Sequence, residues 1–173
     1  VSMPNELFAL GYMLAKDYEY PLRRRVSIPA DFAGQRVLLR FDGVYSRARV
    51  WVNGNFVREH FGGFTAWDCD ITEFVVPGKN ADVLLGITDR SDDISQASYY
   101  AKHVIAGILR GVRLVVVPKT FVRHLHLNST LDSAYRDGIL ELALLLNEAP
   151  AHKAELRLAL RDSDHRQSEL GFV

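Results

Sequence analysis

The sequence has little of what most catalytic or nucleic-acid-binding proteins use, and each absence narrows the class of protein. Cys69 is the only cysteine in 173 residues, so neither an internal disulfide nor a cysteine-based zinc site is available. Lysine plus arginine and aspartate plus glutamate both number 21, and this balance gives no basic surplus for a nucleic acid. No apolar run approaches the roughly 18 residues of a membrane span. We therefore expect neither nucleic acid nor a membrane as a partner.

Signatures of nucleophilic or metal-dependent catalysis are also missing. The serines and the six histidines form no G-x-S-x-G elbow. His124 and His126 share one predicted strand face but have no third ligand at zinc spacing, so an exposed or packed pair is favoured. The acidic cluster at residues 89–93 lacks an ordered calcium loop with a terminal glutamate, which favours a solvated turn. We expect no catalytic residue, no metal and no cofactor in this segment.

What the chain does contain is typical of a globular β protein. Hydrophobic residues make up 48% and charged residues 24%, which excludes a disordered chain. Glycines and prolines separate short runs of β-branched and aromatic residues, and such runs predict strands. The runs are 22–28, 36–41, 47–52, 55–60, 64–70, 82–88 and 112–118. Short, evenly spaced antiparallel strands indicate a sandwich or jelly roll.

Two local patterns in the first part of the chain predict more detail. Asn53-Gly54 separates two alternating runs, and both residues tolerate the positive φ angles of a type I′ hairpin turn. Residues 5–16 place Leu7, Leu10 and Leu14 on one side of a short amphipathic helix.

A domain boundary is predicted near residues 118–119. Beyond it, the runs at 121–128, 138–147 and 153–161 repeat a simpler leucine-rich alternation. Because three strands cannot close a sandwich, which usually takes about seven, the second β domain is incomplete within this chain. The expected layout is one domain over residues 1–119 and part of another over 120–173.

The connection between the predicted strands 82–88 and 112–118 is unusually long. Connections beyond about 12–15 residues are uncommon in compact domains and often carry function. This one is rich in serine, aspartate and tyrosine. It is therefore the first place to look for a site for a small polar molecule.

An ordered series of short motifs runs through the first domain. The motifs are IP at 28–29, FAGQRVLLRFDGV at 32–44, VWVNG at 50–54, His60, GGFT at 62–65, DIT at 70–72 and AGILR at 106–110. In this order they resemble the N-terminal sugar-binding domain of glycoside hydrolase family 2, the β-galactosidase and β-glucuronidase family. The resemblance covers roughly residues 22 to 118.

The resemblance implies a domain order and a division of labour. It implies a jelly roll of the galactose-binding-domain type, then an immunoglobulin-like sandwich beginning near Phe121, then a TIM barrel. In the family, the two catalytic glutamates for retaining hydrolysis lie in the barrel. By this resemblance, the segment lacks the catalytic glutamates and acts as part of an enzyme only together with a downstream barrel.

One position departs from the family pattern. Family members commonly carry an aspartate five residues before the small-Gly-Ile unit, on a loop that reaches the sugar. Counted back from Ala106, that position is Ala101. The resemblance then implies either that this contact is lost or that Lys102 or His103 replaces it.

The substrate-binding residues that we expect lie on the same loop. Tyr99 and Tyr100 offer rings that stack on sugar C–H faces, and His103 offers a hydrogen bond to hydroxyls. Elsewhere, we predict that Trp51 packs between the sheets and that Arg110 pairs with Asp42 or Asp70.

Three hypotheses follow for the function. The first is a non-catalytic domain that binds carbohydrate and braces the barrel of a family 2 glycosidase acting on O-glycosyl bonds. The second is a free-standing carbohydrate-binding module, and the third is a structural sandwich that has lost the sugar contact. Homo-oligomer formation, the compartment (cytoplasmic, periplasmic or secreted) and the particular glycoside stay open at this point.

Overall fold

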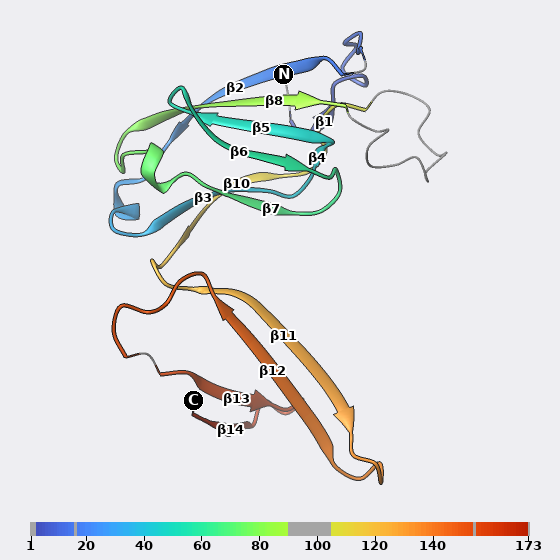
Figure 1. The fold of residues 1–173 in the computed structure, drawn as a ribbon, viewed down its shortest axis with the longest axis vertical. Coiled ribbons are helices and arrows are strands. Elements are labelled where there is room, and N and C mark those ends of the chain that lie inside the picture. Colours follow the sequence, from blue (N-terminus) through green and yellow to red (C-terminus); the bar gives the residue numbers. More distant parts are fainter. Residues whose placement is uncertain (1–2, 16, 90–104, 154, 173) are drawn as a thin grey trace. The chain divides into compact units, whose positions relative to one another are not determined.

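The computed structural model describes residues 3–15, 17–89, 105–153 and 155–172, and the chain divides into two compact units, Val1–Lys119 and Thr120–Val173. Every regular element of more than one turn in these residues is a β-strand (Figure 1). The only helical segments among them are two short 3-10 turns, η1 (Ala30–Phe32) and η2 (Thr72–Phe74). The predicted all-β class is confirmed. No described helix has the length and apolar character to span a bilayer.

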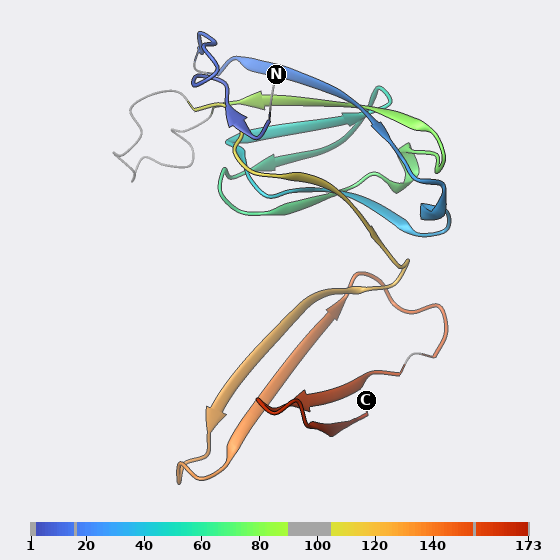
Figure 2. The same ribbon diagram turned by 180° about the vertical axis from the view of Figure 1, so that it is seen from behind.

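The first unit is an antiparallel sandwich. Its strands are β1 (Asn5–Glu6), β2 (Glu19–Ser27), β3 (Arg36–Phe41), β4 (Val44–Tyr45), β5 (Arg47–Val52), β6 (Asn55–Phe61), β7 (Trp67–Asp70), β8 (Asn80–Thr88), β9 (Gly107–Ile108) and β10 (Val112–Val117). The larger sheets have the orders β2-β8-β5-β6 and β10-β3-β7, and a small third sheet has the order β1-β9-β4 (Figures 1 and 2). Apolar side chains from both larger sheets form one buried cluster, so the sheets pack face to face.

The hairpin between β5 and β6 forms as predicted. Asn53 and Gly54 have φ angles of 50° and 84°, and two consecutive positive values are what a type I′ turn requires. The Asn53 side chain also binds outside the turn, because its Oδ1 accepts from the backbone N–H of Asp82 at 2.9 Å. The turn is therefore fixed to the start of β8.

The prediction that Trp51 packs between the sheets is wrong. Side chains alternate across a strand, and β5 points Val50 and Val52 into the core, both with no exposed surface. Trp51 consequently lies on the outer face of the four-stranded sheet. The core tryptophan is Trp67, which is 6% exposed and stacks on Phe41 with 4.3 Å between ring centroids.

The predicted N-terminal helix over residues 5–16 is also not formed. Asn5–Glu6 instead pairs with β9 as strand β1. The following residues make separate turns, with the N–H of Leu10 donating to the carbonyl of Leu7 at 3.1 Å. Gly11 then adopts a φ of 85°, outside the helical region, which ends any regular progression.

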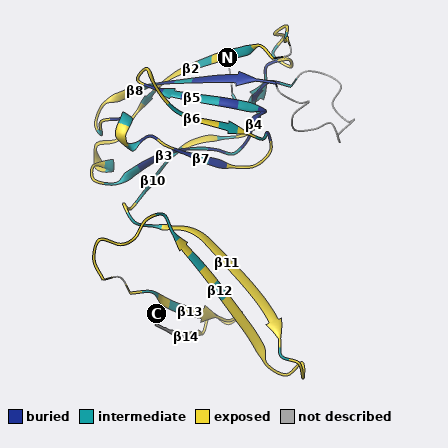
Figure 3. Ribbon diagram, viewed as in Figure 1, coloured by how far each residue is buried: buried dark blue, intermediate teal, exposed yellow. Residues whose placement is uncertain are grey.

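The second unit consists of two β-hairpins. Strands β11 (Val122–Leu131) and β12 (Gly138–Leu146) form one, and β13 (Arg157–Arg161) and β14 (Gln167–Phe172) form the other. Strand β14 was not predicted. Few of the residues in this unit are buried, in contrast to the first unit (Figure 3). Leu125 and Leu127 lie directly opposite Leu144 and Leu142, so the leucines form a stripe on one face of the hairpin.

Candidate functional site

The predicted sugar-contact residues Tyr99, Tyr100 and His103 lie outside the described residues, but both ends of their loop are described. Asp89, the last residue before the loop, is only 1% exposed. Its Oδ2 accepts a hydrogen bond of 2.7 Å from the backbone N–H of Ile105, at the far end of the loop. A buried carboxylate therefore ties the two ends of this connection together.

No metal site accompanies this carboxylate in the described part of the chain. No group of three or more histidine, cysteine, aspartate or glutamate side chains there is arranged to hold an ion. His124 and His126 are exposed on β11. Of the acidic cluster at residues 89–93, only Asp89 is described.

The small third sheet lies beside the ends of the loop. Tyr45 of β4 is registered with Gly107 of β9. The next residue, Ser46, is fully buried, and its backbone N–H donates to the carbonyl of Thr88 at 3.3 Å. These contacts gather β4, the end of β8 and the start of β9 at one end of the first unit (Figures 1 and 2).

The turn after β6 joins the same end. The N–H of Gly62 donates to the carbonyl of Ser46 at 2.9 Å, and Gly62 has a φ of 116°, which favours glycine. A Cβ at Gly63 would lie 2.1 Å from the ring of Tyr45. The Gly-Gly pair is therefore needed for its backbone conformation and for a close approach to Tyr45.

Arg110 binds this turn instead of a carboxylate, so its predicted pairing is wrong. Its Nη1 donates to the carbonyl oxygen of Phe64 at 3.3 Å. The two carboxylates that we expected to hold it belong to other arginines. Asp42 accepts from Arg113 at 2.8 Å, and Asp70 accepts from Arg36 at 2.8 Å.

Phe64 belongs to the GGFT motif, but the sequence did not predict it as a candidate site residue. It is 60% exposed, and its ring lies 5.3 Å from the buried ring of Tyr45. The sequence signal that could have indicated it is an aromatic residue directly after two glycines, Gly62-Gly63-Phe64. The turn after β6 thus presents an aromatic ring, and Arg110, between β9 and β10, places a guanidinium against the same turn.

The outer face of the four-stranded sheet has a different character. Arg49 lies 5.1 Å from the ring centroid of Trp51, and Phe56 contacts the same ring edge to face at 5.6 Å. Arg49 also binds Glu19 at 2.6 Å, and Arg47 binds Glu59. Because the arginines here pair with neighbouring carboxylates and rings, this face is internally neutralised.

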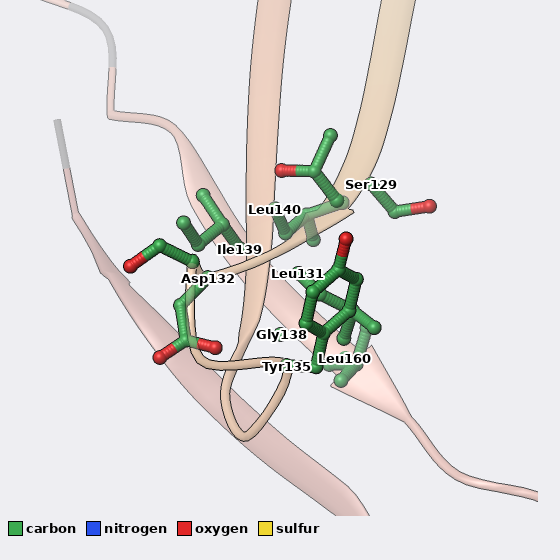
Figure 4. Close-up of a pocket in the computed structure, with 10 residues that line it drawn as sticks. Ser129, Leu131, Asp132, Tyr135, Gly138, Ile139, Leu140 and Leu160 are labelled. Carbon is green, nitrogen blue, oxygen red and sulfur yellow. The ribbon is translucent and has the colours of Figure 1, made fainter.

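A hollow of about 1010 Å³ lies at the β11–β12 turn of the second unit (Figure 4). Leu131, Ile139, Leu140 and Leu160 line it, and all are at least 43% exposed. Asp132 is the one carboxylate among its described lining residues, and its Oδ1 accepts a hydrogen bond of 2.7 Å from the backbone N–H of Arg136 in the turn. Ser129, Thr130, Ser133 and Tyr135 also line the hollow, beside these exposed apolar side chains.

The comparisons with known proteins agree with the motif series. The model of the family "Glycosyl hydrolases family 2, sugar binding domain" matches residues 16–118, and the chain belongs to this family. It is 30% identical over 133 residues to a β-galactosidase of Thermoanaerobacter pseudethanolicus, covering 73% of this chain and 18% of the relative. It is 24% identical over 164 residues to a β-glucuronidase of Paenibacillus borealis, covering 83% of this chain and 27% of the relative.

Solved structures show the same fold. The chain matches a Ruminococcus gnavus β-glucuronidase with a TM-score of 0.74 at 18% identity, over 91% of this chain and 29% of that one. It matches a Lactobacillus rhamnosus β-glucuronidase with a TM-score of 0.71 at 24% identity, over 91% and 29%. The chain thus spans less than a third of each of these relatives.

Proposed function

We propose that this chain is the sugar-binding and bracing segment of a longer family 2 glycoside hydrolase, of the β-galactosidase or β-glucuronidase type. The observation that carries the proposal is the match of residues 16–118 to the family's sugar-binding domain. The small share of each relative that the chain spans supports a role as one part of a larger hydrolase. Carbohydrate is then the ligand, and the bond-breaking glutamates belong to a downstream TIM barrel.

The proposed domain layout is a jelly roll over residues 1–119 and the opening of an immunoglobulin-like sandwich over 120–173. The leucine stripe of the β11–β12 hairpin supports the second assignment. Leu125, Leu127 and Leu140 are about half exposed, although such residues normally form the inner face of a sheet. Further strands of the sandwich would cover this face.

The proposed sugar contact lies on the loop after β8, with Tyr99 and Tyr100 stacking on the sugar and His103 bonding a hydroxyl. The tie between Asp89 and the N–H of Ile105 supports this assignment, because it fixes both ends of the loop. Ala101 stands where the family commonly has an aspartate. The remaining polar contact would then fall to His103 or Lys102.

Substitutions in the longer enzyme test the assignment. We expect Tyr100→Ala and His103→Ala to raise KM by about three- to tenfold each, as loss of one hydrogen bond or stacking contact implies. His124→Ala is the matched control, because His124 is exposed on β11 of the other unit. Unchanged sugar affinity in both loop variants would remove these residues from the site.

Calorimetric titration of the 173-residue chain with galactosides and glucuronides separates the bracing segment from a free-standing module. A bracing segment contributes one wall of a pocket, so it gives no measurable heat alone. Substantial heat of binding by the isolated chain would instead favour the free-standing carbohydrate-binding module.

A further inference from the structure

Arg110 binds a backbone carbonyl, whereas most described arginines of the first unit pair with a carboxylate. Seven of the other arginines that the structure describes in this unit form ion pairs with carboxylates: Arg23, Arg25, Arg36, Arg40, Arg47, Arg49 and Arg113. Among the residues that the structure describes, no carboxylate lies within ion-pair distance of Arg110, which is exposed and donates to the carbonyl of Phe64. A guanidinium carries several N–H donors in a planar fork, so one such bond leaves donors and the whole charge available to an anion.

The backbone of the neighbouring turn is fixed while its aromatic side chain faces outward. The N–H of Gly62 binds Ser46, the backbone of Gly63 lies against the ring of Tyr45, and Arg110 holds the carbonyl of Phe64. One side of the Phe64 ring packs on Tyr45, but the side chain stays 60% exposed, so most of its apolar surface gains nothing from burial within the unit. A ring held in this way is suited to contact with a ligand.

From this pair we infer that Phe64 and Arg110, two residues outside the loop after β8, form a subsite for an acidic sugar residue. The ring would stack on the C–H face of a pyranose, and the guanidinium would bind a carboxylate carried by the same sugar. The inference rests on the proposed function, since it assumes that glycans reach this end of the unit. It uses residues that the loop assignment does not use.

An NMR titration of the ¹⁵N-labelled 173-residue chain tests the subsite, because one ring and one cation give only weak binding. The probes are methyl β-D-glucuronide and methyl β-D-glucoside, which differ only in a carboxylate or a hydroxymethyl group at C6. We expect the glucuronide to shift the amides of residues 62–65 and 110. The glucoside should bind about tenfold more weakly, as loss of a charged hydrogen bond implies. Added salt should weaken the glucuronide alone.

Two variants and two matched controls make the test specific. Arg110→Gln should abolish the preference for the glucuronide, and Phe64→Ala should weaken both sugars. Arg24→Gln and Phe56→Ala, at exposed positions on β2 and β6, should leave both titrations unchanged. Arg110→Lys keeps the charge and should retain the salt dependence with lower affinity. The spectrum of each free variant shows whether it is folded.

Several results would overturn the subsite: no shifts in the turn, equal binding of the two sugars, or equal effects of the control substitutions. Shifts that appear only when another protein segment is added would also overturn it, because the surface would then dock protein. Failure here leaves the proposed function standing if Tyr100→Ala or His103→Ala still raises KM in the longer enzyme. Conversely, a subsite confirmed here does not depend on those loop residues.

Discussion

Glu19 on β2 reaches across β8 to bind Arg49 on β5, with 2.6 Å between Oε2 and Nε. Strand β8 lies between the two in the sheet, so the pair joins strands that share no backbone hydrogen bonds. The crossing occurs over Gly86, where a Cβ would lie 2.5 Å from Glu19 Cδ. Because Gly86 has no side chain, the Glu19 carboxylate can lie over β8 at this position and reach Arg49.

Gly86→Ala should displace the Glu19 carboxylate and break the pair. Both side chains are about a third exposed, so the loss in unfolding free energy should be about 1 kcal/mol or less. Urea unfolding of Gly86→Ala, Glu19→Gln and the double variant measures it. The double variant should be no less stable than Gly86→Ala, because both changes remove one interaction.

Gly107→Ala provides the contrast. There the added Cβ would lie 2.4 Å from the backbone oxygen of Asn5, so the β1–β9 pairing must shift. The loss should exceed that of Gly86→Ala by at least about 1 kcal/mol. Equal losses of unfolding free energy in Gly86→Ala and Gly107→Ala would contradict this account of the two positions.

The two tryptophans should respond very differently to truncation. Trp67→Ala removes a ring stacked in the core and should cost about 3–5 kcal/mol of unfolding free energy. Trp51→Ala acts on the outer face, where Arg49 and Phe56 contact the ring, and should cost about 1 kcal/mol. Chemical unfolding of the two variants gives both values, and a larger loss at Trp51 would reverse the assignment of faces.

The tryptophans also show what the sequence reading could and could not resolve. Alternation in β5 and β6 and the Asn53-Gly54 turn predicted the hairpin, because these signals are local. Which face of β5 meets the core depends on the opposing sheet, and the aromatic character of Trp51 was the wrong guide. The alternating Ala48, Val50 and Val52 were the better one.

Similar limits explain the other differences. The two-residue strands β1, β4 and β9 are too short to carry a periodic pattern and form only through pairing with one another. The partner of Arg110 depends on where the Phe64 turn lies in space, which spacing along the chain does not encode. The motif series, in contrast, predicted the family because it extends over about a hundred positions.

His60 should make the unfolding free energy depend on pH. Burial lowers the pKa of His60, and the nearby Arg58 cation lowers it further. Its ring stacks on Trp67 with 4.5 Å between the ring centroids. Because the folded pKa lies below the unfolded value of about 6.5, the stability present above that pH is lost as the pH falls through the folded pKa.

His60→Phe keeps the stacked ring and removes the titration. Unfolding free energies measured between pH 8 and pH 5 should therefore fall more steeply for the natural chain than for this variant. The difference in slope should correspond to the uptake of at most one proton on unfolding. Parallel pH profiles for the two proteins would show that His60 titrates as it does in the unfolded chain.

Cys69 should be unreactive in the folded chain. Burial raises the pKa of its thiol to about 12, and the side chain has no exposed surface. A thiol reagent at pH 8 should modify it only after denaturation, because the thiolate is the reactive form. Rapid labelling of the native protein would show that β7 opens readily.

Assay of the purified 173-residue chain for hydrolysis of 4-nitrophenyl β-D-galactoside and β-D-glucuronide tests the central claim most directly. Since the catalytic carboxylates are assigned to a barrel outside these residues, the account predicts no release of nitrophenol above the buffer rate. Sustained turnover that copurifies with the chain and is lost when the chain is unfolded would contradict it.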